Sequence, residues 1–199
     1  MSESPAVSPA FWRDLGRLPN LVSLCRIAVI ALAAVIFLSG WRLTGLALGI
    51  PAGLSDYLDG WLARRRGEVT ELGSLLDVLA DLLYQLVCFS LGVHEGVWPV
   101  YLLVAWGFRD LTVTVLRASA AQQGFAIPSS QLAKVAINFN YYSFILMGLD
   151  VARPFSSPAV TLGIHWLGLA GVHAGIAMQW IAGGVYLARY ARRYRGTPA

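Results

Sequence analysis

The chain has 199 residues, of which 57% are hydrophobic and 13% are charged, and its formal net charge is +4. Soluble domains carry about 25% charged residues, so this composition excludes an ordinary soluble globular protein. Its high hydrophobicity also excludes an intrinsically disordered chain. Almost all basic residues are arginines beside apolar segments, which favours a membrane surface as partner and no nucleic acid.

Six stretches approach the ~20 mostly apolar residues that a helix needs to cross a bilayer. In chain order they are residues 21–40, 43–63, 74–93, 98–117, 133–150 and 162–188. The sequence therefore predicts an all-α, polytopic membrane protein with six transmembrane helices.

The segments outside these spans are short. Residues 1–19 are expected to form a cytoplasmic juxtamembrane segment, and residues 20–195 a single six-helix domain. Within the leader, residues 9–18 either form an interfacial helix or are disordered, and the sequence favours neither.

The basic residues also predict the orientation of the spans, because Lys and Arg concentrate in cytoplasmic loops. One predicted side carries only Arg42 and Arg153. The other side carries Arg13, Arg17, Arg64, Arg65, Arg66, Arg117, Lys134, Arg189, Arg192, Arg193 and Arg195. Six spans then place both termini in the cytoplasm.

Acidic residues interrupt the second and third predicted spans. Asp56 and Asp59 are spaced i, i+3, and Asp77 and Asp81 are spaced i, i+4, so each pair shares one helix face. The polar stretch 65–73 joins the two helices, which should be antiparallel neighbours. Asp59 and Asp77 lie about equally far from this connection, and the other pair lies about one turn deeper. The four carboxylates should form two facing layers below the headgroups.

Four carboxylates this close together cannot all stay ionised unaided, because they repel one another and lose hydration. Intramembrane ionisable groups usually serve function. Bound divalent cations would relieve the repulsion, and oxygen ligands suit Mg²⁺ or Mn²⁺. We predict a two-ion site that clamps a phosphate. The alternative, helix capping or pairing with residues 64–66, explains one aspartate more readily than four.

Small residues accompany the aspartates. Gly60, Ala63 and Gly73 either let a ligand approach the backbone or let helices pack closely. Beside the carboxylates we expect an open slot for a flat or phosphorylated ligand. Arg64 could then bind a phosphate, whereas positive-inside anchoring explains Arg65 and Arg66.

The pattern D-x2-D-G-x2-A-R-x8-G-x3-D-x3-D covers residues 56–81. It resembles, without gap or substitution, the motif of the CDP-alcohol phosphatidyltransferases. That resemblance implies an enzyme of the EC 2.7.8 type, in which an alcohol attacks the β-phosphorus of CDP-diacylglycerol and releases CMP. It also implies two Mg²⁺ or Mn²⁺ ions, a homodimer, and a bacterial inner membrane with the active site on the cytoplasmic side.

The resemblance also implies residue roles. Asp56, Asp59 and Asp77 would bind one ion, and Asp56, Asp77 and Asp81 the second, with Asp81 also the base for the acceptor hydroxyl. The CDP-lipid would be bound by Asn20, Ser23, Gly60, Ala63, Arg64, Thr70 and Gly73. Ser23 stands where the family usually has Thr, and it keeps the hydroxyl group.

The acceptor site must come from other helices. Arg109, Arg117 and Lys134 could together bind an anionic acceptor. For Arg109 the alternative is a structural ion pair with Asp110 or Asp81, and for the other two it is anchoring at the membrane surface. Residues 109–117 and Lys134 resemble the phosphatidylglycerophosphate and cardiolipin synthase branch, which implies glycerol 3-phosphate as acceptor.

This branch usually has a Gly-Lys-x-Lys-Thr run, but residues 133–137 read AKVAI. Phosphatidylglycerol, inositol phosphate or another polar alcohol therefore remain alternative acceptors. An ion-coupled transporter is the non-enzyme alternative, although the acids are confined to the cytoplasmic half.

Four further polar residues lie in the last two predicted spans. We expect Asn138 and Asn140 to bond between helices in preference to lining the cavity. His165 and His173 have no evident carboxylate partner in the sequence, and we expect packing or an interhelical hydrogen bond in preference to metal binding.

Overall fold

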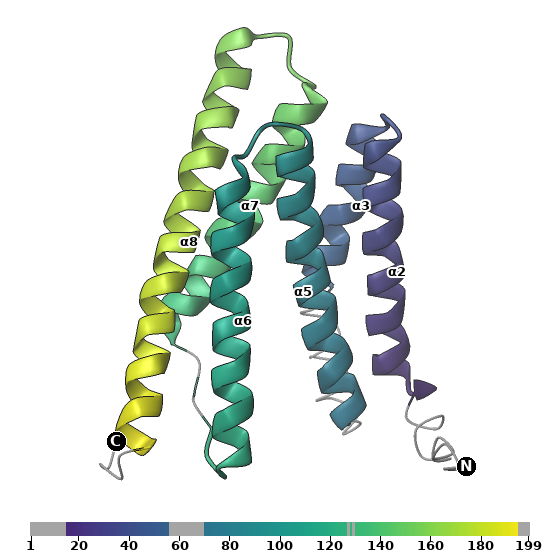
Figure 1. The fold of residues 1–199 in the computed structure, drawn as a ribbon. Coiled ribbons are helices and arrows are strands. Elements are labelled where there is room, and N and C mark those ends of the chain that lie inside the picture. Colours follow the sequence, from purple (N-terminus) through teal and green to yellow (C-terminus); the bar gives the residue numbers. More distant parts are fainter. Residues whose placement is uncertain (1–14, 56–69, 127, 129, 195–199) are drawn as a thin grey trace, which may run out of the picture. The chain divides into compact units, whose positions relative to one another are not determined.

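The computed structural model describes residues 15–55, 70–126, 128 and 130–194, and all regular structure in these ranges is helical. The structure has six helices in its described residues, labelled in Figure 1, which confirms the predicted all-α class. They are α2 (Leu18–Leu38), α3 (Arg42–Leu54), α5 (Glu71–His94), α6 (Val100–Gln122), α7 (Gln131–Ala152) and α8 (Pro158–Tyr194).

Four of the described helices are long and apolar enough to cross a membrane, namely α2, α5, α7 and α8. Helix α6 is as long as the others but carries Arg109, Asp110 and Arg117. Large apolar side chains are exposed along these helices, as expected for surfaces that face lipid and not water. The protein is therefore an integral membrane protein.

Several predicted boundaries need correction. Helix α5 begins at Glu71 and not at residue 74, and α8 continues to Tyr194 because its arginine-rich end stays helical. Helix α3 is described only to Leu54. Residues 56–63 of the predicted second span, and residues 9–14 of the predicted interfacial helix, lie outside the described residues.

The chain divides into two units, one up to Cys88 and one from Phe89 onward. The first contains α2, α3 and most of α5. Helices α2 and α3 are joined by a tight turn in which Gly40 has φ +93°. A Cβ atom at Gly45 would lie 2.7 Å from Cβ of Phe37 and 2.8 Å from the carbonyl oxygen of Ala33. Glycine therefore allows the two helices to pack closely.

The second unit contains the end of α5 together with α6, α7 and α8. Ser130 caps α7, since its Oγ accepts a 3.2 Å hydrogen bond from the amide nitrogen of Ala133. Glycines on α8 allow α7 to approach: a Cβ atom at Gly171 would lie 2.5 Å from Oγ of Ser143. A cluster of four aromatic rings adds to the core, formed by Phe89, Trp98, Trp106 and Phe144.

Candidate active site

Two of the four predicted metal ligands are described, and both lie on α5. Asp77 and Asp81 are one helical turn apart, and their side chains are 45% and 48% exposed. Both carboxylates pair with the guanidinium group of Arg26 on α2. The nitrogen-to-Oδ1 distances are 3.6 Å to Asp77 and 2.5 Å to Asp81. The structure thus places both aspartates next to the same buried guanidinium group.

Arg26 also contacts the third helix of this unit. Its Nε donates a 3.0 Å hydrogen bond to the carbonyl oxygen of Ala52 on α3. Arg26 was not among the residues predicted to form the site. A single arginine within the apolar first span was the available signal, because charged residues in spans usually serve function.

The donors on α5 fit a hard divalent cation, because both are carboxylates on one helix face. The described contacts with Arg26 involve one oxygen of each carboxylate, Oδ1. Within the described ranges no group of three or more His, Cys, Asp or Glu side chains could hold a metal ion. The predicted partners Asp56 and Asp59 lie outside those ranges, and so do Gly60, Ala63 and Arg64.

The described residues predicted to bind the CDP-lipid lie on α2 and at the start of α5. Asn20 is 1% exposed, and its Nδ2 donates a 3.2 Å hydrogen bond to Oγ1 of Thr70. The same Oγ1 accepts a 3.0 Å hydrogen bond from the amide nitrogen of Gly73. Ser23 is also buried, about one turn after Asn20 on α2. The structure therefore brings Asn20, Thr70 and Gly73 together.

Gly73 has a specific packing role. A Cβ atom at this position would overlap Oδ1 of Asn20. The sequence was compatible with two roles for this glycine, approach of a ligand or close packing of helices. In the structure, the side chain of Asn20 occupies the space that Gly73 provides.

The three residues predicted to bind the acceptor belong to the second unit. Arg109 is 8% exposed; its Nε donates a 3.1 Å hydrogen bond to the carbonyl oxygen of Gln179, and its Nη1 lies 3.3 Å from Oδ1 of Asp110. Arg117 donates a 2.9 Å hydrogen bond to the hydroxyl of Tyr186. The ion pair with Asp110 is the structural alternative that the sequence suggested.

These contacts join α6 to α8 at two levels. The guanidinium carbon of Arg117 also lies 5.1 Å from the ring centre of Tyr186, within the range of a cation–π interaction. Lys134 is exposed near the start of α7. Of the three predicted acceptor residues, Arg117 and Lys134 are therefore exposed, whereas Arg109 is buried.

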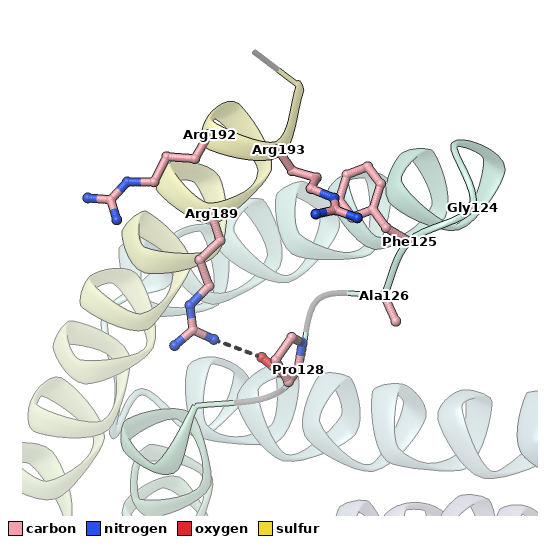
Figure 2. A pocket seen from close by; sticks show the side chains of 7 residues that line it. All are labelled: Gly124, Phe125, Ala126, Pro128, Arg189, Arg192 and Arg193. Carbon is pink, nitrogen blue, oxygen red and sulfur yellow. Dashed lines mark hydrogen bonds between the residues drawn. The ribbon is translucent and has the colours of Figure 1, made fainter. Parts of the chain in front are cut away.

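A basic pocket of about 700 Å³ lies at the end of α8 and was not predicted. Figure 2 shows Arg189 extending to the α6–α7 connection, where its Nη1 donates a 3.3 Å hydrogen bond to the carbonyl oxygen of Pro128. Arg193 and Phe125 also line this pocket. The lining residues are Gly124, Phe125, Ala126, Pro128, Arg189, Arg192 and Arg193. The sequence indicated these arginines only as part of the positive-inside bias.

For His165 the expected interhelical hydrogen bond is found, but the premise that it lacks a carboxylate partner is wrong. His165 does have a carboxylate partner, because its Nδ1 lies 2.8 Å from Oδ2 of Asp150. The short connection after α7 returns the chain, so that a residue near the end of α7 contacts the start of α8. The expected interhelical hydrogen bond of His173 is confirmed, at 2.6 Å from its Nε2 to the hydroxyl of Tyr101.

The two asparagines of α7 differ in their surroundings. Asn138 is exposed, whereas Asn140 is 1% exposed. Neither amide atom of Asn140 has a hydrogen-bond partner among the described residues, so the expected interhelical hydrogen bond is not found there. Its amide instead packs against Gly175 of α8.

The site thus comprises acidic side chains on a membrane helix, held by a buried arginine beside an asparagine–threonine pair. Residues 17–182 match the profile of a family described as CDP-alcohol phosphatidyltransferase. Because this match spans most of its length, the chain belongs to the CDP-alcohol phosphatidyltransferase family. It is accordingly a membrane transferase of phospholipid biosynthesis, of the EC 2.7.8 class.

Individual relatives have two different names. A cardiolipin synthase (CMP-forming) of Streptomyces coelicolor is 31% identical over 193 residues, which cover 92% of this chain and 86% of the relative. A CDP-diacylglycerol–glycerol-3-phosphate 3-phosphatidyltransferase of Pseudomonas fluorescens is 29% identical and covers 85% of this chain and 84% of the relative. A Bacillus subtilis protein with this second name is 31% identical and covers 59% and 69%, respectively.

Proposed function

We propose that the protein transfers the phosphatidyl group of CDP-diacylglycerol to glycerol 3-phosphate, forming phosphatidylglycerophosphate and releasing CMP. The observation that carries the proposal is the convergence of Asp77 and Asp81 on one buried arginine. The family match supplies the reaction class. The acceptor is inferred from the relatives that act on glycerol 3-phosphate by name, and from the basic groups of the second unit.

In this proposal Asp56, Asp59, Asp77 and Asp81 hold two Mg²⁺ or Mn²⁺ ions. When bound, these ions neutralise charge on the diphosphate and on the leaving CMP. Asn20, Ser23, Thr70 and Gly73 line the CDP-lipid site together with Gly60, Ala63 and Arg64. The partly buried Asn20–Thr70 hydrogen bond supports these roles, because it holds the start of α5 against α2.

Asp81 acts as the general base. Its carboxylate takes the proton of the acceptor hydroxyl as that oxygen attacks the β-phosphorus. A phosphodiester bond forms, the bond to the oxygen of CMP breaks, and the nucleotide leaves. The ion pair with Arg26 supports this role, because it restrains the carboxylate while leaving it about half exposed.

The acceptor phosphate is bound by Arg109, Arg117 and Lys134. The pocket of Arg189, Arg192 and Arg193 attracts the same phosphate from the cytoplasm. These roles suit a phosphate-bearing acceptor better than a neutral alcohol.

A second candidate acceptor is phosphatidylglycerol, which would make the protein a cardiolipin synthase. The observation in its favour is the Streptomyces coelicolor relative, whose similarity covers 92% of this chain. Both acceptors contain a phosphate, so the basic residues do not discriminate between them.

The proposed setting is a bacterial inner membrane, with six spans, both termini in the cytoplasm and the active site on that side. The arginine-rich end of α8 supports this orientation. We further propose a homodimer, on the family resemblance.

The test measures CMP release by purified enzyme in detergent. CDP-diacylglycerol and Mg²⁺ or Mn²⁺ are supplied with glycerol 3-phosphate, phosphatidylglycerol, inositol phosphate, inositol or serine. Among these acceptors, we expect only glycerol 3-phosphate to support CMP release. Release only with phosphatidylglycerol would support the second candidate, and no release with any acceptor would contradict both.

A further inference from the structure

The side chain of Arg26, which forms ion pairs in the first unit, is only 2% exposed. It lies within an apolar helix that is long enough to span a membrane. Burying a guanidinium group is costly unless partners satisfy it, so its contacts account for its presence. Among the described residues, those contacts are with Ala52, Asp77 and Asp81.

The three contacts use different parts of the guanidinium group. Nε donates to the carbonyl oxygen of Ala52, whereas Nη1 and Nη2 face the two aspartates. The bond to a main-chain oxygen of α3 fixes the orientation of the planar group. Because arginine presents its donors in a rigid fork, the carboxylates on α5 are held relative to α2 and α3.

A lysine could not do the same, because it has a single charged nitrogen on a flexible stem. It could pair with one aspartate at a time, but it could not hold both while bonding to Ala52. The geometry therefore requires the shape of arginine as well as its charge.

We propose that Arg26 is a positioning residue for the metal ligands of the active site. It hydrogen-bonds to Oδ1 of Asp81 and forms a longer ion pair with Oδ1 of Asp77, and so restrains both carboxylates for cation binding. The proposal rests on the two-ion site of the proposed function. Arg26 itself is not a ligand and does not contact the reacting atoms.

Positioning and simple electrostatics predict opposite effects on metal affinity. A positive charge beside a cation site repels the incoming ion, so its removal alone would strengthen binding. Loss of a residue that hydrogen-bonds to metal ligands and orients them weakens metal binding by about 10- to 100-fold. The direction of the change therefore separates the two explanations.

The experiment titrates Mn²⁺ into purified protein in detergent, without substrate, and follows free Mn²⁺ by electron paramagnetic resonance. The variants are Arg26→Gln and Arg26→Lys. The matched controls are Arg42→Gln and Arg42→Lys at the exposed start of α3. Circular dichroism and gel filtration establish that each variant is folded, and Arg26→Lys retains the charge if Arg26→Gln does not fold.

We expect both Arg26 variants to bind Mn²⁺ about 10- to 100-fold more weakly than the parent protein, with the Arg42 variants unchanged. Unchanged or tighter binding by folded Arg26→Lys would overturn the proposal, even if its thermal stability fell. If the parent protein bound no Mn²⁺, the two-ion site would fail as well, so the two failures are distinguishable.

Discussion

Asn20 of α2 and Thr70, the residue before α5, are joined by a 3.2 Å hydrogen bond between Nδ2 and Oγ1. The hydrogen bond links positions fifty residues apart. It fixes the start of the helix that carries Asp77 and Asp81. Helix α2 therefore contributes to the candidate site through Asn20 as well as Arg26.

Replacement of Asp81 by asparagine is expected to reduce CMP release by at least about 10²–10⁴-fold, because it removes the proposed base and a metal ligand. The amide can still accept a hydrogen bond from Arg26, so the variant should remain folded in detergent. Asp150→Asn, which changes an acid in the second unit, is the control. CMP release is measured at saturating substrate, and full activity of Asp81→Asn would contradict the assignment.

Gly73→Ala is expected to displace Asn20, since the new Cβ atom overlaps its Oδ1. Overpacking of this kind costs about 1–3 kcal/mol of stability. The KM for CDP-diacylglycerol should rise more than the KM for the acceptor. Gly163→Ala is the control, because no atom lies within 4 Å of the added Cβ there. An equal effect of the two substitutions on thermal unfolding and KM would refute this account.

Arg109→Ala is expected to raise the KM for the acceptor about 10- to 100-fold, the effect of losing a charge-assisted hydrogen bond. The KM for CDP-diacylglycerol should change much less. The ion pair of Arg109 with Asp110 makes a purely structural role the competing explanation. Initial rates with each substrate varied in turn distinguish the two. Equal changes in both KM values would remove Arg109 from the acceptor site.

Arg193→Gln should raise the KM for glycerol 3-phosphate about tenfold if the basic pocket attracts the acceptor phosphate. Added salt should reduce the difference from the parent enzyme, because exposed charges are screened. Arg42→Gln serves as a control for the loss of one exposed arginine. If the KM of Arg193→Gln matched that of the control at low salt, the pocket would have no role in acceptor binding.

The helices were largely predictable, whereas the contacts between them were not. The apolar runs that became α2 and α5 were evident from composition, and the spacing of Asp77 and Asp81 indicated a shared helix face. The rotation of α2 that directs Arg26 to those aspartates depends on packing against α3, which no local pattern encodes.

Residue pairs that bring distant segments together show the same limit. Asp150 and His165 lie in different predicted spans, and only the path of the connection between α7 and α8 makes them partners. The pocket near Arg193 depends on how the α6–α7 connection folds against the end of α8. The predicted facing of Asp56 and Asp59 with the α5 aspartates stays a prediction, since those two residues lie outside the described ranges.

The close approach of α2 and α3 at Gly45 has a genetic consequence. Any larger side chain there would push α2 and α3 apart. This would also displace Ala52, which lies two turns further along α3 and accepts the hydrogen bond from Arg26. A screen for strains defective in making phospholipids should therefore recover substitutions of this glycine, although it touches no substrate. Second-site suppressors should be substitutions of Phe37 or its neighbours on α2 by smaller residues, which would restore the packing of α2 against α3.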